Sequence, residues 1–406
     1  MTNTEWKEST IGDIADVQTG PFGSQLHEKD YVSAGTPIVT VEHLGNRIFS
    51  TQNLPMVSDS DKSRLQKYCM QHGDLIFSRV GSVDRCTYAN KNNEGWLFSG
   101  RCLRVRPQEC VDSMWLYYFF CLESTKTFIR NIAVGATMPS INTKLMCEVP
   151  VKYPPLAEQQ RIAKILSSLD DKIELNNAIN RNLEEQAQAL FKSWFVDFEP
   201  FGGEMPEDWN EVCLKDCCSS ITDGVHNTVI DDPDGDFYLL SCKNIKGGVL
   251  SVGSDERKIN KETFDKLRKR TKLAKGDILL SSVGTVGEML LLTKDPENIE
   301  FQRSVAIIKA ERNLVSPEFL YNSLIAQKDT IVNAAHGAVQ QCIFLSDIGD
   351  FKTILPTSEY MNKYTLLVSP YYEQISKNQA ENMRLISMRD SLLPKLMSGD
   401  LKLASA

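Results

Sequence analysis

The sequence predicts an α+β protein: two mixed α/β domains separated by two long helices that pack as an antiparallel coiled coil, with an internal two-fold repeat. Three observations support this fold class. Residues 156–198 carry an uninterrupted heptad pattern, the pattern returns about 202 residues later, and motifs of the preceding segment return at nearly the same offset. We expect a first domain over 1–155, a central helix over 156–199, a second domain over 200–358 and a C-terminal helix over 359–406.

The central helix is the clearest element. Steps of four and three residues, taken alternately from Ile162, trace one apolar seam, and no Pro or Gly interrupts it. At 1.5 Å per residue, about 40 residues form a rod of roughly 60 Å, which needs a partner helix along its length. The seam comprises Ile162, Leu166, Leu169, Ile173, Asn176, Asn180, Leu183, Ala187, Leu190 and Trp194.

The partner helix is expected in the same chain. The equivalent positions are Tyr364, Val368, Tyr371, Ile375, Asn378, Asn382, Leu385, Arg389, Leu392 and Leu396. Both Asn pairs recur, and we interpret all four as fixing helix register. Arg389 puts a charge on the seam. Pro370 stands where the first helix has Ser168, so we expect a bend or break near 369–370, with the cleanest helix over 371–397.

The segments before the helices also match. HGDLIFSRVGSV (72–83) resembles KGDILLSSVGTV (275–286), Glu5-Trp6 matches Asp208-Trp209, and Gly135-Ala136 matches Gly337-Ala338. Ser316 and Pro317 are suited to begin a helix. We expect strands at 37–43, 74–80 and 102–107, then a helix over 113–130; the second copy repeats this order with strands at 238–244, 277–283 and 304–310 and a helix over 317–332.

Composition bounds the class of protein. The chain has 406 residues, 42% of them hydrophobic and 24% charged, which is typical of a globular protein. No apolar run reaches about 18 residues and the start does not resemble a signal peptide, so no membrane association is expected. Eleven unpaired-looking Cys favour a reduced, cytoplasmic setting. Cys213, Cys217 and Cys218 lie near His226 but form no CxxC, so no metal site is predicted.

Familiar catalytic motifs are missing. No two Gly are separated by one residue, which excludes GxGxxG, and no GxxxxGK[ST] loop occurs. KYPPL (152–156) superficially resembles the [DN]PP[YFW] motif of amino-methyltransferases, but Tyr153 stands where an Asp or Asn oxygen is required. We therefore predict no catalytic residue and no cofactor in this chain.

Basic and acidic residues are concentrated in different parts of the chain. The net charge is −8, yet residues 256–275 carry nine basic and three acidic side chains. Residues 156–199 of the first helix carry eight acidic and five basic ones, and we expect Glu184 and Glu185 on its outer, protein-facing side. Basic domains on an acidic helix indicate domains that face phosphate and a helix that faces protein. The alternative for 256–275 is an ordinary solvated helical face.

PPLAEQQRIAKILSSLDDKIELNNAINRNLEEQAQALFKSWFVDFEPF (154–201), with TGPFGSQL (19–26), TDGVHNT (222–228) and the repeated GD motif, resembles the specificity (S) subunits of type I restriction–modification systems over nearly the whole chain. The resemblance implies that each domain is a target-recognition domain reading one half of a bipartite site in double-stranded DNA. It implies that the helices set the spacer and dock two modification (methyltransferase) subunits, with restriction subunits as a further possible partner. S-adenosylmethionine, ATP and Mg would then belong to the partner subunits, and this chain would be non-catalytic.

Eight residues are our candidates for DNA contact. Arg and Lys can hold phosphate, and Arg can also bind guanine through two hydrogen bonds. Asp223 and His226 match the family's DG-x-H motif, although a His there can equally stabilise its loop. Internal ion pairs and plain surface charge are the alternatives for the others. The candidates are Arg79, Arg85, Arg101, Asp223, His226, Lys269, Arg270 and Arg303.

Two other functions stay open from the residues alone. A stand-alone DNA methyltransferase or endonuclease would need its own cofactor site, and bound S-adenosylmethionine in the purified chain would reveal one. A coiled-coil scaffold unrelated to DNA would lack salt-dependent DNA binding.

Overall fold

A computed structural model describes residues 6–21, 23, 25–253, 256–337, 340–401 and 403. The chain forms two compact units, unit 1 (Met1–Ile173 with Met383–Ala406) and unit 2 (Glu174–Asn382). Four residues of the matched motifs, Glu5, Phe22, Ser24 and Ala338, lie outside the described residues.

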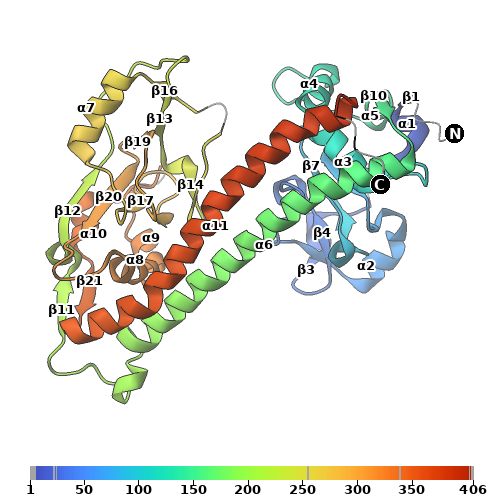
Figure 1. The fold of residues 1–406 in the computed structure, drawn as a ribbon. Helices are drawn as coiled ribbons and strands as arrows, with labels where there is room; N and C mark the ends of the chain where they lie inside the picture. Colours follow the sequence, from blue (N-terminus) through green and yellow to red (C-terminus); the bar gives the residue numbers. More distant parts are fainter. Residues whose placement is uncertain are drawn as a thin grey trace. The chain divides into compact units, whose positions relative to one another are not determined.

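Unit 1 contains two four-stranded sheets and a two-stranded one (Figure 1). The first sheet is antiparallel, in the order β2 (Ala15–Thr19), β9 (Cys102–Pro107), β6 (Leu75–Ser78), β7 (Cys86–Tyr88). The second has the order β3 (Tyr31–Val32), β5 (Met56–Val57), β4 (Thr36–Val39), β8 (Leu97–Phe98), with β4 and β8 parallel. β1 (Lys7–Thr10) pairs with β10 (Pro150–Tyr153).

Unit 2 repeats this plan. Its antiparallel sheet has the order β12 (Cys218–Asp223), β20 (Val305–Ala310), β17 (Ile278–Ser281), β18 (Met289–Leu291). A three-stranded sheet follows the order β16 (Lys258–Ile259), β13 (Phe237–Leu240), β19 (Ile299–Phe301), with β13 and β19 parallel. β11 (Asn210–Cys213) pairs with β21 (Lys352–Leu355), and β14 (Ile245–Lys246) with β15 (Val249–Leu250). The predicted two-fold repeat is therefore confirmed in strand order.

Short helices cover the sheets in the same order in each unit. Unit 1 has α1 (Ile11–Ile14), α2 (Asp59–Arg64), α3 (Ser113–Cys121), α4 (Glu123–Ile132) and α5 (Thr143–Cys147). Unit 2 has α7 (Lys261–Thr271), α8 (Pro317–Ala326), α9 (Lys328–Asn333) and α10 (Leu345–Asp350). The two long helices, α6 (Leu156–Phe195) and α11 (Ser358–Ser398), contribute residues to both units.

Several predicted element bounds are wrong. The single helices expected over 113–130 and 317–332 are each two helices, because the backbone leaves helical geometry at Leu122 (ψ 134°) and Gln327 (φ −104°, ψ 13°). The strands expected to reach residues 43 and 244 stop early. There the side chains of His43 and Asn244 accept bonds from the amides of Thr40 (3.1 Å) and Ser241 (2.9 Å), which closes a turn.

The long helices run antiparallel. In unit 1, Ile162 and Leu166 of α6 share a buried core with Leu396 and Leu393 of α11. In unit 2, Phe191 and Ala187 share a core with residues near the start of α11, including Tyr364. Residue numbers that rise along one helix thus fall along the other.

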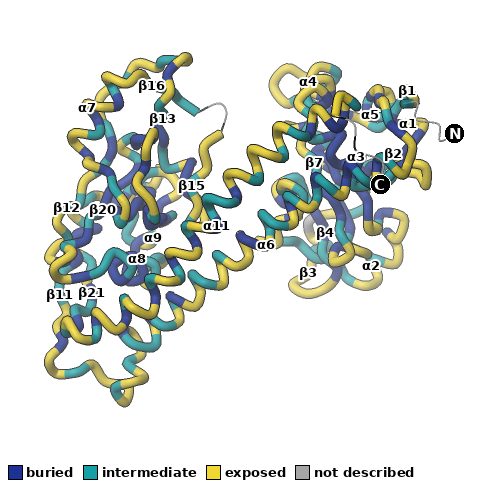
Figure 2. Tube along the Cα trace, in the orientation of Figure 1, coloured by how far each residue is buried: buried dark blue, intermediate teal, exposed yellow. Residues whose placement is uncertain are grey.

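In the middle of the helix pair, the predicted seam lies between α6 and α11. Towards the C-terminal end of α6, the buried positions shift to the side that faces the second domain. Beyond Leu183 the buried positions of α6 are Ala187, Phe191 and Phe195. Figure 2 shows α6 as a mixture of buried, intermediate and exposed segments. Of the predicted seam, Ile162, Leu166, Asn176, Ile375, Asn378 and Asn382 are buried, whereas Leu169, Ile173, Asn180, Leu183, Leu190, Leu385 and Leu392 are half-buried.

The four seam Asn residues bond across the helix pair. Asn176 donates to Asn382 (2.9 Å), and Asn378 donates to Asn180 (2.8 Å). Asn382 also donates to Asn177 (2.8 Å). A shift of one helix by a turn would break these bonds and leave some of the amides without a partner, which penalises other registers.

The predicted break at Pro370 is wrong, because α11 runs unbroken from Ser358 to Ser398. Proline lacks the amide that would bond the carbonyl four residues earlier. Here that carbonyl belongs to Leu366, a residue that is 77% exposed, and Pro370 itself is exposed. Water can therefore bond the freed carbonyl, and the proline ring lies on the solvent side of the helix.

Among the described residues, no helix combines the length and the apolar character needed to cross a membrane.

Candidate nucleic-acid interface

Three predicted Arg residues of unit 1 meet at one edge of the first sheet. In antiparallel strands, the end of one strand lies beside the start of its neighbour. The amide of Arg79, just past β6, donates to the carbonyl of Arg101, just before β9 (2.8 Å), and the amide of Ser78 donates to the carbonyl of Arg85 (3.0 Å). We call this edge, with Arg79, Arg85 and Arg101, the first strand-end surface.

The side chains at this edge differ in freedom. Arg85 and Arg101 are exposed, whereas Arg79 is half-buried. Arg85 lies 3.4 Å from the carbonyl of Val41, a long contact, and Arg101 has no side-chain bond to any described residue. Exposed guanidinium groups of this kind can bind phosphate or guanine.

Two further Arg residues of β9 are structural instead. The side chain of Arg104 is buried and donates to Asp16 (2.6 Å), and Arg106 makes two bonds of 2.7 Å with the buried Asp74. The bond with Asp74 raises the pKa of Arg106. These cations are neutralised inside the domain, so strand position alone does not mark a DNA contact.

Unit 2 brings its predicted residues to the equivalent edge. The amide of Arg303, before β20, donates to the carbonyl of Val225, which follows β12 (3.1 Å), and the amide of Ser282, after β17, donates to the carbonyl of Ser304 (2.9 Å). Asp223, His226 and Arg303 therefore meet there as the second strand-end surface. Arg303 and His226 are exposed.

His226 is tied into its loop. Its Nε2 lies 2.6 Å from Oδ2 of Asp223, and 58% of the His226 side chain remains exposed. The pair orients the imidazole ring while leaving it accessible, so loop stabilisation and DNA contact are compatible here. Asp223 itself is mostly covered.

Gly20 and Gly224, which the sequence prediction missed as a pair, form the tightest points of the two edges. A Cβ on Gly20 would lie 2.1 Å from the Ser99 carbonyl oxygen, and one on Gly224 would lie 2.1 Å from that of Phe301. Only Gly allows the loops after β2 and β12 to pass this close to the sheet. Their signal was the shared position of TG and DG after the second strand of each copy.

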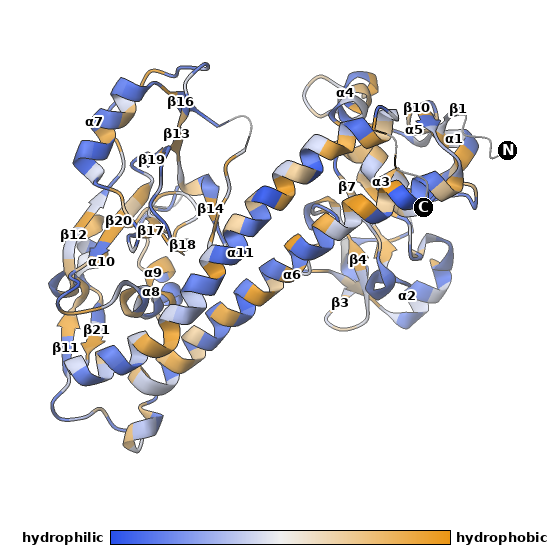
Figure 3. Ribbon diagram, viewed as in Figure 1, coloured by the Kyte–Doolittle hydropathy of each residue, from blue (hydrophilic) through white to orange (hydrophobic). Residues whose placement is uncertain are grey.

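α7 adds a cationic flank to the second strand-end surface. Asn260 caps its start by accepting from the Thr263 amide (3.0 Å), and Phe264 and Leu267 bury its inner face. Arg270 donates to the carbonyl of Asp223 (2.9 Å), so the end of α7 adjoins the recognition loop. Lys269, the residue before Arg270, is exposed with no bond to a described residue, and Figure 3 shows α7 as strongly hydrophilic.

One cation of α7 is internal. Arg268 pairs with Glu300, which is fully buried, and donates to the carbonyls of Pro296 and Ile299 (2.8 Å each). Burial raises the pKa of Glu300, and the bond with Arg268 opposes this. The α7 segment is therefore neither wholly solvated nor wholly a binding face.

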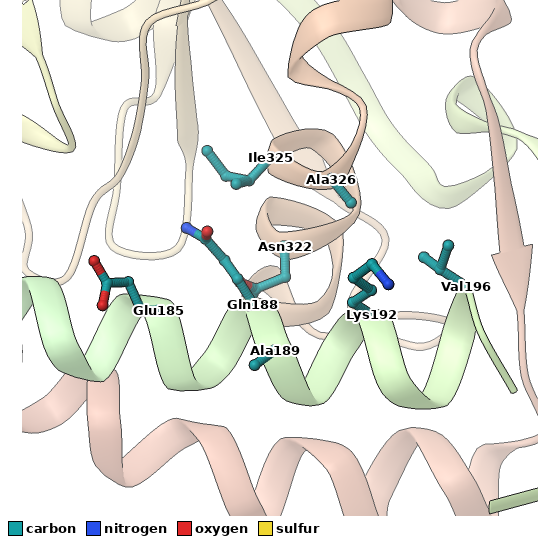
Figure 4. Close-up of a pocket in the computed structure, with 8 residues that line it drawn as sticks. All are labelled: Glu185, Gln188, Ala189, Lys192, Val196, Asn322, Ile325 and Ala326. Atoms are coloured by element: carbon teal, nitrogen blue, oxygen red, sulfur yellow. The ribbon is translucent and has the colours of Figure 1, made fainter. Parts of the chain in front are cut away.

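A separate cavity of about 360 Å³ lies in unit 2 between α6 and α8 (Figure 4). It is away from the strand ends and combines apolar walls with one acid and one Lys. Its lining is Glu185, Gln188, Ala189, Lys192, Val196, Asn322, Ile325 and Ala326.

The predicted protein-facing role of Glu184 is wrong in its geometry. A Cβ on Gly248 would lie 3.1 Å from Glu184 Oε1, so this carboxyl faces the β14–β15 turn of the second domain. Burial raises the pKa of Glu184 to about 7. The repeat of acidic residues along α6 could not show which of two neighbours faces inward. Glu185 is the exposed one.

In the described part of the chain, no three His, Cys, Asp or Glu side chains lie close enough to hold a metal ion, and this includes the Cys213–Cys218 region. What the two strand-end surfaces offer is hydrogen-bond donors and positive charge at the surface. Such groups suit binding of an anionic polymer.

Fold and site together define a duplicated recognition protein, in which two similar domains each present their own binding edge. The family model described as "Type I restriction modification DNA specificity domain" matches residues 3–185 and again residues 206–381. The chain belongs to this family of type I restriction–modification specificity subunits and carries the domain twice.

Individual relatives agree over the whole length. The MjaIX specificity subunit of Methanocaldococcus jannaschii is 26% identical, and the match covers 98% of this chain and 94% of that protein. The HindI specificity subunit of Haemophilus influenzae is 24% identical, over 98% and 100% of the two chains. The crystal structure of the S subunit from M. genitalium has a TM-score of 0.56 at 16% identity, over 98% and 97%, which shows a shared fold. The enzyme and scaffold alternatives gain no support.

Proposed function

We propose that each domain reads one half of a bipartite site in double-stranded DNA through its strand-end surface, and that the chain itself catalyses no reaction. The observation that supports this proposal is that equivalent sheet edges in the two domains carry different side chains. The first has Arg79, Arg85 and Arg101, and the second has His226 and Arg303. One scaffold presenting two different sets of donors suits two different half-sites.

The exposed cations would serve affinity first. A protein that neutralises several phosphates gains binding that falls steeply with salt. Three exposed cations can bind phosphate in this way: Arg85, Arg101 and Lys269. Three others already bond groups within their own domain: Arg104, Arg106 and Arg268. Base reading would come from the groups nearest the loops.

The catalytic chemistry would lie in partner subunits of a cytoplasmic complex. Two modification (methyltransferase) subunits, and restriction subunits where present, would supply S-adenosylmethionine, ATP and Mg sites. We place their docking on the exposed sides of α6 and α11, with Glu185 rather than Glu184 on that surface. Replacing Glu185 with Lys is expected to weaken co-purification of the modification subunit, and full recovery would exclude this position.

The helix pair would set the spacer between half-sites. To test this, seven residues are inserted after Ile173 in α6 and seven after Leu385 in α11, which keeps the pairs Asp170–Arg389 and Asn176–Asn382 in place. The added length is about 10 Å, or roughly three base pairs. We expect methylation at the same half-sites with a longer spacer. Insertion into α6 alone is the control and should abolish activity through mismatched registers.

Independent reading is tested by a domain exchange. Residues 210–355 are replaced by the corresponding segment of another specificity subunit, and methylated adenines are mapped in cells that also contain the modification subunit. One half of the site should change and the other should persist. A change in both halves, or in neither, would refute the proposal.

A further inference from the structure

The loop 134–141 of unit 1 is held in a fixed frame beside the first strand-end surface. Its ends are closed by two backbone bonds between Val134 and Ser140 (2.9 and 2.8 Å). Its second half is tied to the segment after β6, because the amide of Ile141 donates to the carbonyl of Arg79 (3.0 Å) and the amide of Gly81 to that of Pro139 (2.8 Å). The loop therefore continues the edge that carries the Arg residues.

Unit 2 builds the same frame bond for bond. His336 and Cys342 exchange two backbone bonds (2.7 and 2.8 Å). The amide of Ile343 donates to the carbonyl of Ser282 (2.9 Å), and the amide of Gly284 to that of Gln341 (2.8 Å).

The frame also uses the same turn. Gly135 and Gly337 both have positive φ (113° and 102°), and a Cβ on either would lie within 2.7 Å of a loop carbonyl oxygen. The described parts of the two loops therefore share the same backbone bonds and the same turn glycine, and a side-chain difference between them is not explained by the fold.

What the frames present is different. The loop of unit 1 exposes apolar groups, with Val134 64% and Met138 66% exposed. The described part of the other loop exposes two amides, Gln340 and Gln341. Exposing a Met and a Val on one small loop has no packing benefit within the domain. Two loops that share their backbone bonds but expose different side chains have the arrangement expected of an element that sets specificity.

We propose that the loop 134–141 and residues 340–343 are the base-reading elements of the two domains, with Met138 packing on thymine methyl groups and Gln341 bonding adenine. The major groove offers the thymine methyl as its apolar feature, and a side-chain amide matches the N6 and N7 groups of adenine. The cations of the strand-end surfaces would hold the adjoining phosphates. This inference rests on the proposed function and assigns base recognition within it.

The test uses the full chain in complex with its modification subunits. Duplexes carrying the mapped site, with each base pair changed in turn, are titrated with the wild-type complex and with Met138→Ala and Gln341→Ala variants. Non-specific binding to an unrelated duplex is measured alongside. Ile48→Ala is the matched control, because Ile48 is a 46% exposed apolar residue of the same domain whose neighbour Arg47 bonds α6 instead.

We expect Met138→Ala to lose preference at one or two positions of one half-site, roughly tenfold each, and Gln341→Ala to do so only in the other half-site. Non-specific binding should stay unchanged. Equal loss on all duplexes, or unchanged preference at every position, would overturn the inference while leaving the proposed function intact. If the wild-type complex itself showed no sequence preference, the proposed function would fail instead.

Discussion

The two places where a domain packs on the long helices have the same topology but opposite chemistry. In unit 1 the joint is polar. Tyr118 of α3 donates to Asp170 of α6 (2.6 Å), and Arg389 of α11 donates to the same carboxylate (2.7 Å). We call these three residues the polar joint. It also explains why a charge is tolerated on the α11 seam, since Asp170 is buried and paired.

In unit 2 the domain packs on the long helices largely through aromatic rings. Phe195 of α6 lies with its ring 5.0–5.5 Å from those of Phe319, Tyr364 and Trp209. Tyr372 of α11 lies near Tyr321 of α8 and donates to Asn322 (3.0 Å). We call the cluster around Phe195 the aromatic joint.

The comparison distinguishes two properties of a domain–helix contact, namely how much it stabilises the domain and how far it tolerates an incomplete set of partners. Burial of aromatic rings supplies much of the stability of a contact, whereas a buried ion pair adds little net stability and is costly when one partner is missing. Both joints fasten a similar domain to the same two helices. The fold therefore requires that the contact be filled, and does not fix how.

The largest effect is expected at the aromatic joint. Phe195→Ala should lower the free energy of unfolding of unit 2 by about 3–5 kcal/mol, because it empties a site that is 3% exposed and removes three ring contacts. Urea unfolding followed by Trp fluorescence measures this. Val196→Ala, at a neighbour that is 48% exposed, is the control and should change the value by under about 0.5 kcal/mol.

At the polar joint, Arg389→Met should cost about 3 kcal/mol, because the buried Asp170 loses its cation. Arg384→Met, at an exposed position of α11, is the control. The triple variant Tyr118→Phe, Asp170→Leu, Arg389→Met should recover most of the loss, since an apolar set replaces the whole group. No recovery in urea unfolding would mean that the ion pair itself, and not its completeness, stabilises unit 1.

Near the aromatic joint, Glu184 should make unit 2 sensitive to pH. Burial raises the pKa of Glu184 from 4.5 to about 7, and Arg181 opposes the shift. The folded state then holds a proton that the unfolded state releases, so stability falls as pH rises from about 4.5 to 7 and is constant above. Glu184→Gln removes this loss. Its advantage over wild type should grow by about 2 kcal/mol between pH 5 and pH 8. An advantage independent of pH would contradict this.

The smallest effect concerns DNA. Unit 1 has the six-residue α2 where unit 2 has the eleven-residue cationic α7, so the second domain should hold more phosphates. Lys269→Ala should reduce the slope of log affinity against log salt by about one, on every sequence equally. Asp265→Ala on the same helix is the control and should not reduce it. A sequence-selective loss for Lys269→Ala would assign it to a base instead.

Much of this protein could be read from the sequence because the signals are periodic and local. The heptad seam, the duplicated GD motif and the Ser316–Pro317 helix start depend on residues a few positions apart, and the structure contains each of them. The α+β class and the family followed from their order and repetition. Local signals failed at Leu122 and Gln327, where apolar runs continue through a break in the helix.

Tertiary structure decided which polar groups are partnered. Arg101, just before β9, and Arg104, within it, are three residues apart, yet only Arg104 meets a carboxylate, because it reaches Asp16 on the neighbouring strand, two positions from its direct partner Gln18. The same holds for Arg389, whose partner Asp170 is 219 positions away. Hydrogen bonds and ion pairs form between groups that the fold brings within about 3 Å, whatever their distance along the chain. Periodicity carries no information about those meetings, so the strand-end surfaces and the two joints emerged only from the packed chain.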